Sequence, residues 1–145
     1  MKIEDIKRVL ILGAGTMGQQ IGFLCATHGY DVVYYDLSQE ILDKALKRVA
    51  KLGSWHVSMG LLTEDNLQQA LSRISTTPDP EQAARDADFI SESVPEDPGL
   101  KGKVFARFNE LCPERTIFTT NTSMLVPSMF AEATGRPEKL VALHF

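Results

Sequence analysis

Residues 8–18 read Arg-Val-Leu-Ile-Leu-Gly-Ala-Gly-Thr-Met-Gly, a mainly apolar run followed at once by the pattern GxGxxG. Such a run is typical of a parallel strand that is covered on both faces. Apolar residues then recur at helical spacing over 16–28, and Gly29 is suited to end that helix. Because residues 31–35 are again β-branched and aromatic, the stretch 8–36 predicts a strand, a helix and a second strand.

Each glycine of this pattern meets a separate requirement of a nucleotide-binding turn. Gly13 allows the tight turn, Gly15 lets the backbone approach a pyrophosphate, and Gly18 lets the helix lie close to the strand. The N-terminus of the helix adds free N–H groups and a partial positive charge, which both favour phosphate. The loop that would hold the phosphates consists of Gly13, Ala14, Gly15, Thr16, Met17 and Gly18. After a strand and at the start of a helix, the pattern predicts a dinucleotide site.

The acidic residue that follows the second strand indicates which dinucleotide is bound. Asp36 comes 21 residues after Gly15, where a carboxylate can accept hydrogen bonds from the ribose hydroxyls of the adenosine half. The same charge would repel a 2′-phosphate, and the next residues, Leu37 and Ser38, provide no arginine to bind one. We therefore expect the cofactor to be NAD rather than NADP.

The remainder of the chain continues to alternate between helical and strand patterns. Ser38 is a good N-cap for a long helix that ends near residue 52, and residues 53–60 are expected to form a turn. Further helices are expected at 63–71, 80–86, 100–111 and 129–133, and further strands at 73–76, 87–94, 116–120 and 140–144. This alternation predicts one domain over residues 1–145. Its fold class is α/β, a Rossmann-type doubly wound, mainly parallel sheet with a helical arm after the second strand.

The composition excludes several classes of function. The 145 residues include 19 acidic and 15 basic side chains, for a net charge of −4. A nucleic-acid binder needs a basic face, and none is indicated. No apolar run is long enough to span a bilayer and no signal peptide is recognisable, so we expect a cytoplasmic protein without membrane contact. Cys25 and Cys112 are expected to be free thiols, and no spacing of His and Cys predicts a metal site.

Four segments beyond the glycine loop carry a more specific pattern. They are Asp-Phe-Ile-Ser-Glu-Ser-Val-Pro-Glu at 88–96, Lys101, Asn-Thr-Ser at 121–123 and Leu-His-Phe at 143–145. In order and spacing they resemble the 3-hydroxyacyl-CoA dehydrogenase family, over the whole chain. The resemblance implies NAD-dependent oxidation of the 3-hydroxyl of an L-3-hydroxyacyl-CoA to the 3-oxoacyl-CoA, in fatty-acid or related acyl-CoA metabolism.

The same resemblance implies roles for individual residues. The residues that would contact the cofactor are Met17, Val94, Glu96, Lys101 and Ser123. Of these, Glu96 and Lys101 would lie near the nicotinamide half. Ser123 would also hydrogen-bond the 3-oxygen of the substrate, and His144 would be the catalytic base. An imidazole can take up and release a proton near neutral pH, which suits that role.

The resemblance does not extend to a complete active site. In the family, the motif around His144 continues with Asn-Pro, and a later glutamate orients the histidine. A helical C-terminal domain then completes the substrate pocket and forms the homodimer. Because the sequence ends at Phe145, we expect it to be the NAD-binding domain of a longer, homodimeric enzyme. We expect this domain to be incomplete at its C-terminal end and inactive when alone.

Two features leave open whether the small-molecule substrate is an acyl-CoA or a free short hydroxy acid. Relatives that use acyl-CoA offer a serine and a lysine of the helical arm to CoA, where this chain has Ala45 and Leu52. Basic residues of the same predicted helix that could replace them are Lys47, Arg48 and Lys51. In addition, the pair Pro95-Glu96 resembles branches that oxidise free short 3-hydroxy acids, as carnitine and gulonate dehydrogenases do.

Two further alternatives lie outside this reaction. A non-catalytic NAD-binding protein could keep the fold, as lens crystallin relatives of the family do, although Ser123 and His144 favour an enzyme. The β-hydroxyacid dehydrogenases also carry GxGxMG, but they use a lysine in a later helix. The segment Leu-His-Phe fits the hydroxyacyl family better.

Overall fold

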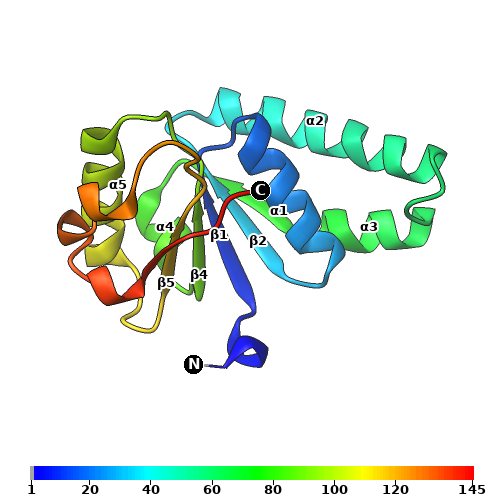
Figure 1. The fold of residues 1–145 in the computed structure, drawn as a ribbon. Helices are drawn as coiled ribbons and strands as arrows, with labels where there is room; N and C mark the ends of the chain where they lie inside the picture. The colour runs from blue at the N-terminus through cyan, green and yellow to red at the C-terminus, as the bar shows by residue number, and fades with distance from the viewer. Residues whose placement is uncertain (1) are drawn as a thin grey trace.

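The computed structural model describes residues 2–145, which form one parallel sheet covered by helices on both faces (Figure 1). The strands are β1 (Arg8–Leu12), β2 (Asp31–Tyr35), β3 (Ile74–Thr77), β4 (Phe89–Glu92), β5 (Ile117–Thr120) and β6 (Leu140–Ala142). The helices are α1 (Thr16–Thr27), α2 (Gln39–Ser58), α3 (Glu64–Ser72), α4 (Pro80–Ala84) and α5 (Pro98–Leu111). The doubly wound fold is confirmed, and α2 and α3 form the helical arm.

The order of the strands places the ends of β1 and β4 together. The order is β3-β2-β1-β4-β5-β6, and every neighbouring pair in residues 2–145 is parallel. The chain therefore runs outward from β1 to β3, returns to β4 beside β1, and then runs outward in the other direction. In such sheets, ligands bind outside the carboxyl ends of the strands at this reversal point. The glycine loop after β1 and the segment after β4 meet there.

Each face of the sheet has its own apolar core, because alternate strand residues point to opposite faces. Toward α1, α2 and α3 the strands present Val9, Ile11, Val32 and Tyr34. Toward α4 and α5 they present Leu10, Leu12, Val33, Tyr35, Ile90 and Phe118. Figure 1 shows these two groups of helices on opposite sides of the sheet. Since both faces are covered, consecutive residues of β1 are buried, which explains the apolar run before Gly13.

The prediction that the helix after Ser38 ends near residue 52 is wrong, because α2 continues through Gly53 to Ser58. Gly53 is buried, and a Cβ at this position would overlap the side chain of Leu67 in α3. The glycine therefore allows two helices of the arm to pack closely instead of ending one of them. The turn comes later, at Gly60, whose φ of +70° lies in the left-handed region that favours glycine.

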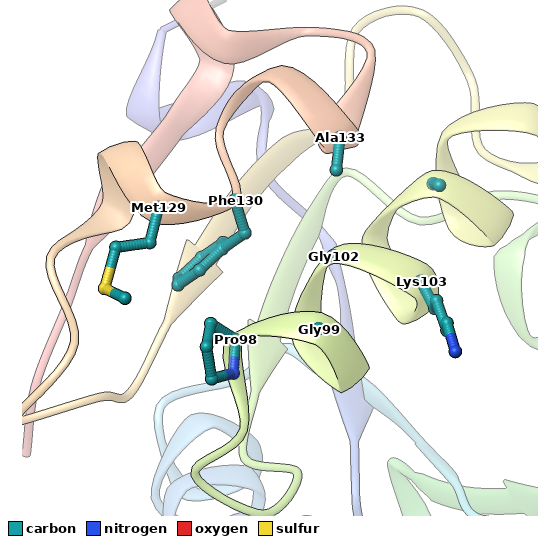
Figure 2. A pocket seen from close by; sticks show the side chains of 8 residues that line it. Pro98, Gly99, Gly102, Lys103, Met129, Phe130 and Ala133 are labelled. Atoms are coloured by element: carbon teal, nitrogen blue, oxygen red, sulfur yellow. The ribbon is translucent and has the colours of Figure 1, made fainter.

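The expected helix over 129–133 is replaced by two 3-10 turns, Pro127–Met129 and Glu132–Thr134. Phe130 leaves the helical conformation between them, and its buried ring stacks on Phe105 of α5 with centroids 5.8 Å apart. Figure 2 shows the Phe130 ring turned toward α5 and Ala133 facing Gly102. Burial of this ring therefore outweighs the local helical pattern.

The remaining element ends differ by a few residues from the prediction. The expected strands 87–94 and 140–144 are shorter, since pairing stops at Glu92 and Ala142. In the part of the chain that the structure describes, no helix combines the length and apolar character needed to cross a membrane. No group of three or more His, Cys, Asp or Glu side chains within residues 2–145 is arranged to hold a metal ion.

Candidate functional site

The glycine loop has the backbone geometry of a phosphate-binding turn. Gly13 has a φ of +97°, and a Cβ on it would lie 2.8 Å from the carbonyl oxygen of Ser93. A Cβ on Gly18 would overlap the carbonyl oxygen of Gly13. At Gly15, by contrast, a Cβ would meet no other atom within 4 Å. Gly13 and Gly18 are therefore required by the fold, whereas Gly15 leaves an open approach to the backbone, as a bound pyrophosphate needs.

The loop contains two buried residues and two exposed ones besides Gly13 and Gly15. Ala14 and Gly18 are buried, and Gln19 Nε2 donates a hydrogen bond of 2.7 Å to the carbonyl oxygen of Ala14. Thr16 and Met17 are exposed in the first turn of α1. The N-terminus of α1 is therefore accessible to a ligand, and the backbone just before it is held in place.

Asp36 follows β2 and holds the glycine loop. Its Oδ2 accepts a hydrogen bond of 2.8 Å from the backbone N–H of Ala14, and its Oδ1 accepts one of 2.8 Å from the N–H of Leu37. A carboxylate has about four lone-pair sites, so acceptor sites are left for ribose hydroxyls. The carboxylate is thus oriented toward the loop that would hold the pyrophosphate.

A cleft of about 730 Å³ lies at this reversal point of the sheet. Five of the sequence-predicted residues line it, namely Gly13, Gly15, Asp36, Val94 and Glu96. Tyr35, Leu37, Leu100 and Phe108 add apolar walls, and Lys103 and Arg107 of α5 add positive charge. Backbone N–H groups, a carboxylate for ribose and apolar walls for a base are what a dinucleotide requires, so these residues fit NAD.

Lys101 lies beneath this cleft and does not line it. Its side chain is 1% exposed, and its Nζ donates to Glu92 Oε1 at 2.7 Å and to the carbonyl oxygen of Val94 at 3.2 Å. Glu96 Oε2 forms an ion pair with the same nitrogen at 3.1 Å. Direct contact between Lys101 and the cofactor therefore stays a prediction, while the structure places the lysine against the segment that lines the cleft.

Glu96 connects this lysine to the loop after β5. Its Oε1 accepts a hydrogen bond of 2.7 Å from the hydroxyl of Thr122. That hydrogen bond is the main reason why the pKa of Glu96 is lowered; burial opposes the shift, and Lys101 and the backbone N–H of Ser123 add to it. Thr122 Oγ1 in turn accepts from the N–H groups of Met124 and Leu125 at 3.3 and 3.0 Å. Glu96 thus stays ionised and holds the loop that carries Ser123.

Ser123 and His144 both lie just beyond the carboxyl ends of neighbouring strands. Each is exposed, Ser123 after β5 and His144 after β6. The backbone on both sides of His144 is held to the end of β5, since Leu143 N donates to Thr120 O and Phe145 N donates to Asn121 Oδ1, both at 3.0 Å. The two segments expected to supply the base and the hydroxyl are therefore held together at the carboxyl ends of β5 and β6.

Two residues of this site were not predicted from the sequence. Glu92 is fully buried at the end of β4, and Thr122 links Glu96 to the loop after β5. The available signal for Glu92 was a carboxylate in an otherwise buried strand, since such a group is rarely buried without a partner. Thr122 gave no signal of its own, because hydroxyls after strands are common in loops.

Comparison with known proteins agrees with this geometry. The family model described as "3-hydroxyacyl-CoA dehydrogenase, NAD binding domain" matches residues 8–145. The chain is 35% identical to a 3-hydroxyadipyl-CoA dehydrogenase of Escherichia coli K12 over 97% of its length and 30% of the relative. It is 36% identical to a 3-hydroxybutyryl-CoA dehydrogenase of Clostridioides difficile over 95% of its length and 49% of the relative.

The structure of a diketoreductase that acts on dicarbonyl compounds is also similar. It shares 41% identity, with a TM-score of 0.91, over 97% of this chain and 50% of that one. The chain thus spans half or less of the length of these relatives. It belongs to the family of NAD-binding domains of 3-hydroxyacyl-CoA dehydrogenases, and its cofactor is NAD.

Proposed function

We propose that this chain is the NAD-binding part of an enzyme that oxidises the 3-hydroxyl of an L-3-hydroxyacyl-CoA to the 3-oxoacyl-CoA. The observation that carries the proposal is the meeting of four segments at the carboxyl edge of the sheet. The glycine loop and the residues after β4 line one cleft there, and the segments of Ser123 and His144 follow the adjacent strands. The names of the relatives support the same reaction class.

In this proposal the cofactor and the chain have separate tasks. NAD, when bound, supplies the acceptor for the hydride that leaves C3 of the substrate. Gly13, Gly15 and Asp36 would bind its adenosine and pyrophosphate. Val94 and Glu96 would also contact the cofactor, with Glu96 near the nicotinamide half. The backbone bonds on both sides of His144 would orient the imidazole, which takes the proton of the 3-hydroxyl. Ser123 would donate a hydrogen bond to the same oxygen and stabilise its developing charge.

Three exposed basic residues of the helical arm would bind CoA. Ala45 is fully buried in the core, so it cannot contact a ligand. Lys47, Arg48 and Lys51 are exposed on α2. These cations are available for the phosphates of CoA, in place of the serine and lysine that other relatives offer. Exposed lysines and arginines are also common on helices that bind no ligand. The arm therefore supports an acyl-CoA substrate less strongly than the segments at the carboxyl ends of the strands support oxidation of a 3-hydroxyl.

A second candidate function is oxidation of a free short 3-hydroxy acid. The 41% identity to a diketoreductase favours it, because that protein is described as acting on dicarbonyl compounds. The pair Pro95-Glu96, which lines the cleft, points in the same direction. Both candidates share the cofactor, the proton acceptor and the C3 chemistry, and they differ only in whether CoA is recognised.

The proposal is tested in two steps. NADH binding to the 145-residue chain, followed by nucleotide fluorescence, tests the cofactor site; a chain that binds no NADH contradicts the proposal. Turnover of 3-hydroxybutyryl-CoA, 3-hydroxybutyrate and carnitine by a longer protein containing the chain separates the two candidates. Oxidation of the CoA ester alone supports the first, and oxidation of a free acid supports the second. NADH binding without turnover of any hydroxy acid would indicate a non-catalytic relative.

Several features of the whole protein stay predictions. They are a helical C-terminal domain that completes the pocket, a homodimer, a cytoplasmic location, the absence of nucleic-acid partners, and inactivity of the 145-residue chain alone. Light scattering on a longer protein tests the dimer, and the turnover assay on the chain itself tests the last point.

A further inference from the structure

We propose that Glu92 and Lys101 are positioning residues for this site. In this arrangement, Glu92 holds Lys101, and Lys101 holds Glu96 and the loop after β4. Glu96 then holds Thr122 and the loop that presents Ser123. The inference rests on the proposed function, since it assigns the buried residues that keep two of its loops in place.

This series of contacts begins at the buried carboxylate of Glu92. Its Oε1 accepts from Val94 N at 2.6 Å and from Lys101 Nζ at 2.7 Å, and its Oε2 accepts from the Thr120 hydroxyl at 2.6 Å. All three partners are donors, so the group accepts hydrogen bonds as a carboxylate. With 0% exposure it cannot contact a ligand itself. It joins the ends of β4 and β5 to helix α5.

The three donors of the Lys101 ammonium group each have an oxygen within reach in this structure. An ammonium group has three N–H bonds, and three oxygens lie within 3.2 Å of Nζ, one each from Glu92, Val94 and Glu96. The side chain is also almost completely shielded from solvent. The lysine therefore holds the two ends of the loop, Val94 and Glu96, which both line the cleft.

The contacts pass from this loop to the loop after β5. Glu96 bonds the Thr122 hydroxyl, and the same hydroxyl accepts from the backbone of Met124 and Leu125. Ser123 lies between these anchored residues. Its position relative to the cleft thus depends on a buried charge pair formed by residues of β4 and α5. This is the kind of support that holds reacting groups in productive geometry.

Stability and positioning can be separated with a double variant. Removing one partner of a buried ion pair leaves the other charge unpaired and destabilises the protein, whereas replacing both charges is often tolerated. In Glu92→Gln/Lys101→Met, the glutamine oxygen can still accept from Val94 N, and its NH2 group can donate to the hydroxyl of Thr120. Glu96, however, loses its cation. The double variant therefore keeps the fold but releases the loop after β4.

The experiment compares the 145-residue chain with Glu92→Gln, Lys101→Met and the double variant. Urea unfolding gives the free energy of unfolding, and fluorescence titration gives the Kd for NADH. Amide hydrogen exchange without nucleotide reports on Val94, Glu96 and residues 122–125. We expect the double variant to have a larger free energy of unfolding than at least one of the two single variants. We expect it to bind NADH about 10- to 100-fold more weakly than the unaltered chain, the range typical when a supporting partner is lost. Exchange in both segments should be faster.

Ser91→Ala is the matched control. Ser91 neighbours Glu92 on β4, is equally buried, and has a hydroxyl without a hydrogen-bond partner. Its truncation should leave the Kd and the exchange of both segments unchanged. A double variant that binds NADH as tightly as the unaltered chain, with unchanged exchange, overturns the positioning role. If the unaltered chain binds no NADH, the proposed function fails instead, and the exchange data still decide whether Glu92 and Lys101 hold the two loops.

Discussion

The side chain of Asp36 accepts a hydrogen bond of 2.8 Å from the backbone N–H of Ala14, 22 residues earlier in the chain. The carboxylate that is expected to select NAD by its charge is therefore also a support of the glycine loop. The predicted recognition of the ribose and the shape of the glycine loop would then be coupled through one side chain. A substitution at Asp36 should change both.

Asp36→Asn should lower the preference for NADH over NADPH. The amide oxygen can still accept from Ala14, but the negative charge that repels a 2′-phosphate is lost. We expect the ratio of the two Kd values to change about tenfold, equivalent to about 1.4 kcal/mol. Fluorescence titration with both nucleotides measures it. Asp43→Asn, on the exposed side of α2, is the control. An unchanged ratio would mean that Asp36 does not face the ribose.

Gly15→Ala and Gly18→Ala should separate ligand binding from folding. A Cβ on Gly15 has free space, so unfolding free energy should change by no more than about 1 kcal/mol. The added methyl group should nevertheless weaken NADH binding about tenfold or more, because it occupies the approach to the backbone. A Cβ on Gly18 overlaps Gly13, so that variant should lose about 3 kcal/mol or more of stability. Urea unfolding and NADH titration of both variants provide the check; equal stabilities would contradict it.

Asp88→Asn should weaken the amino-terminal edge of the sheet. Asp88 Oδ2 accepts from Lys7 N and Arg8 N at 2.9 and 3.0 Å, and Oδ1 accepts from Arg115 Nε at 2.8 Å. An asparagine cannot accept all three bonds in the same geometry, so we expect a loss of about 1–3 kcal/mol at pH 7. Asp86→Asn removes only an exposed ion pair with Arg8 and should cost less than about 1 kcal/mol.

The effect of Asp88 should also depend on pH. Burial by itself raises the pKa of this carboxyl, but the bonds from Lys7, Arg115 and Arg8 outweigh it and lower the pKa overall. Its stabilisation is therefore complete above the unfolded-state pKa of about 3.9 and is lost as the pH falls through the lower folded-state value. Unfolding at pH 7, 5 and 3 should show the difference between the unaltered chain and Asp88→Asn shrinking only at the lowest pH. A difference that grows on acidification would contradict this.

His144→Gln should abolish proton transfer without affecting cofactor binding. In a longer protein that turns over substrate, kcat should fall about 10²- to 10⁴-fold, the usual contribution of a positioned base. The Kd of the 145-residue chain for NADH should stay the same, because His144 does not line the cleft. His28→Gln, at the exposed end of α1, serves as the control for both measurements. A weakened Kd with an unchanged kcat would place His144 in cofactor binding instead.

The fold could be predicted well from the sequence because its main signals are local. Apolar runs, glycine positions and caps such as Ser38, whose side chain accepts from Ile41 N, act within a few residues. Errors arose where distant contacts outweighed these signals. The sequence predicts Gly53 to lie in a turn, but Leu67 packs against α2 at this glycine. Phe130 interrupts an apparent helix because its ring stacks on Phe105.

The candidate site likewise combines features that depend on local sequence with features that depend on distant contacts. By itself, the sequence determined the dinucleotide turn and the resemblance that singled out Ser123 and His144, and it predicted that Asp36 selects NAD. Each of these depends on residue type at a fixed spacing. Only the tertiary structure decided that Lys101 is enclosed by Glu92, Val94 and Glu96, and that Thr122 joins Glu96 to the next loop. The reason is physical: these contacts join β4, α5 and the end of β5, and their partners become neighbours only when the parallel sheet forms.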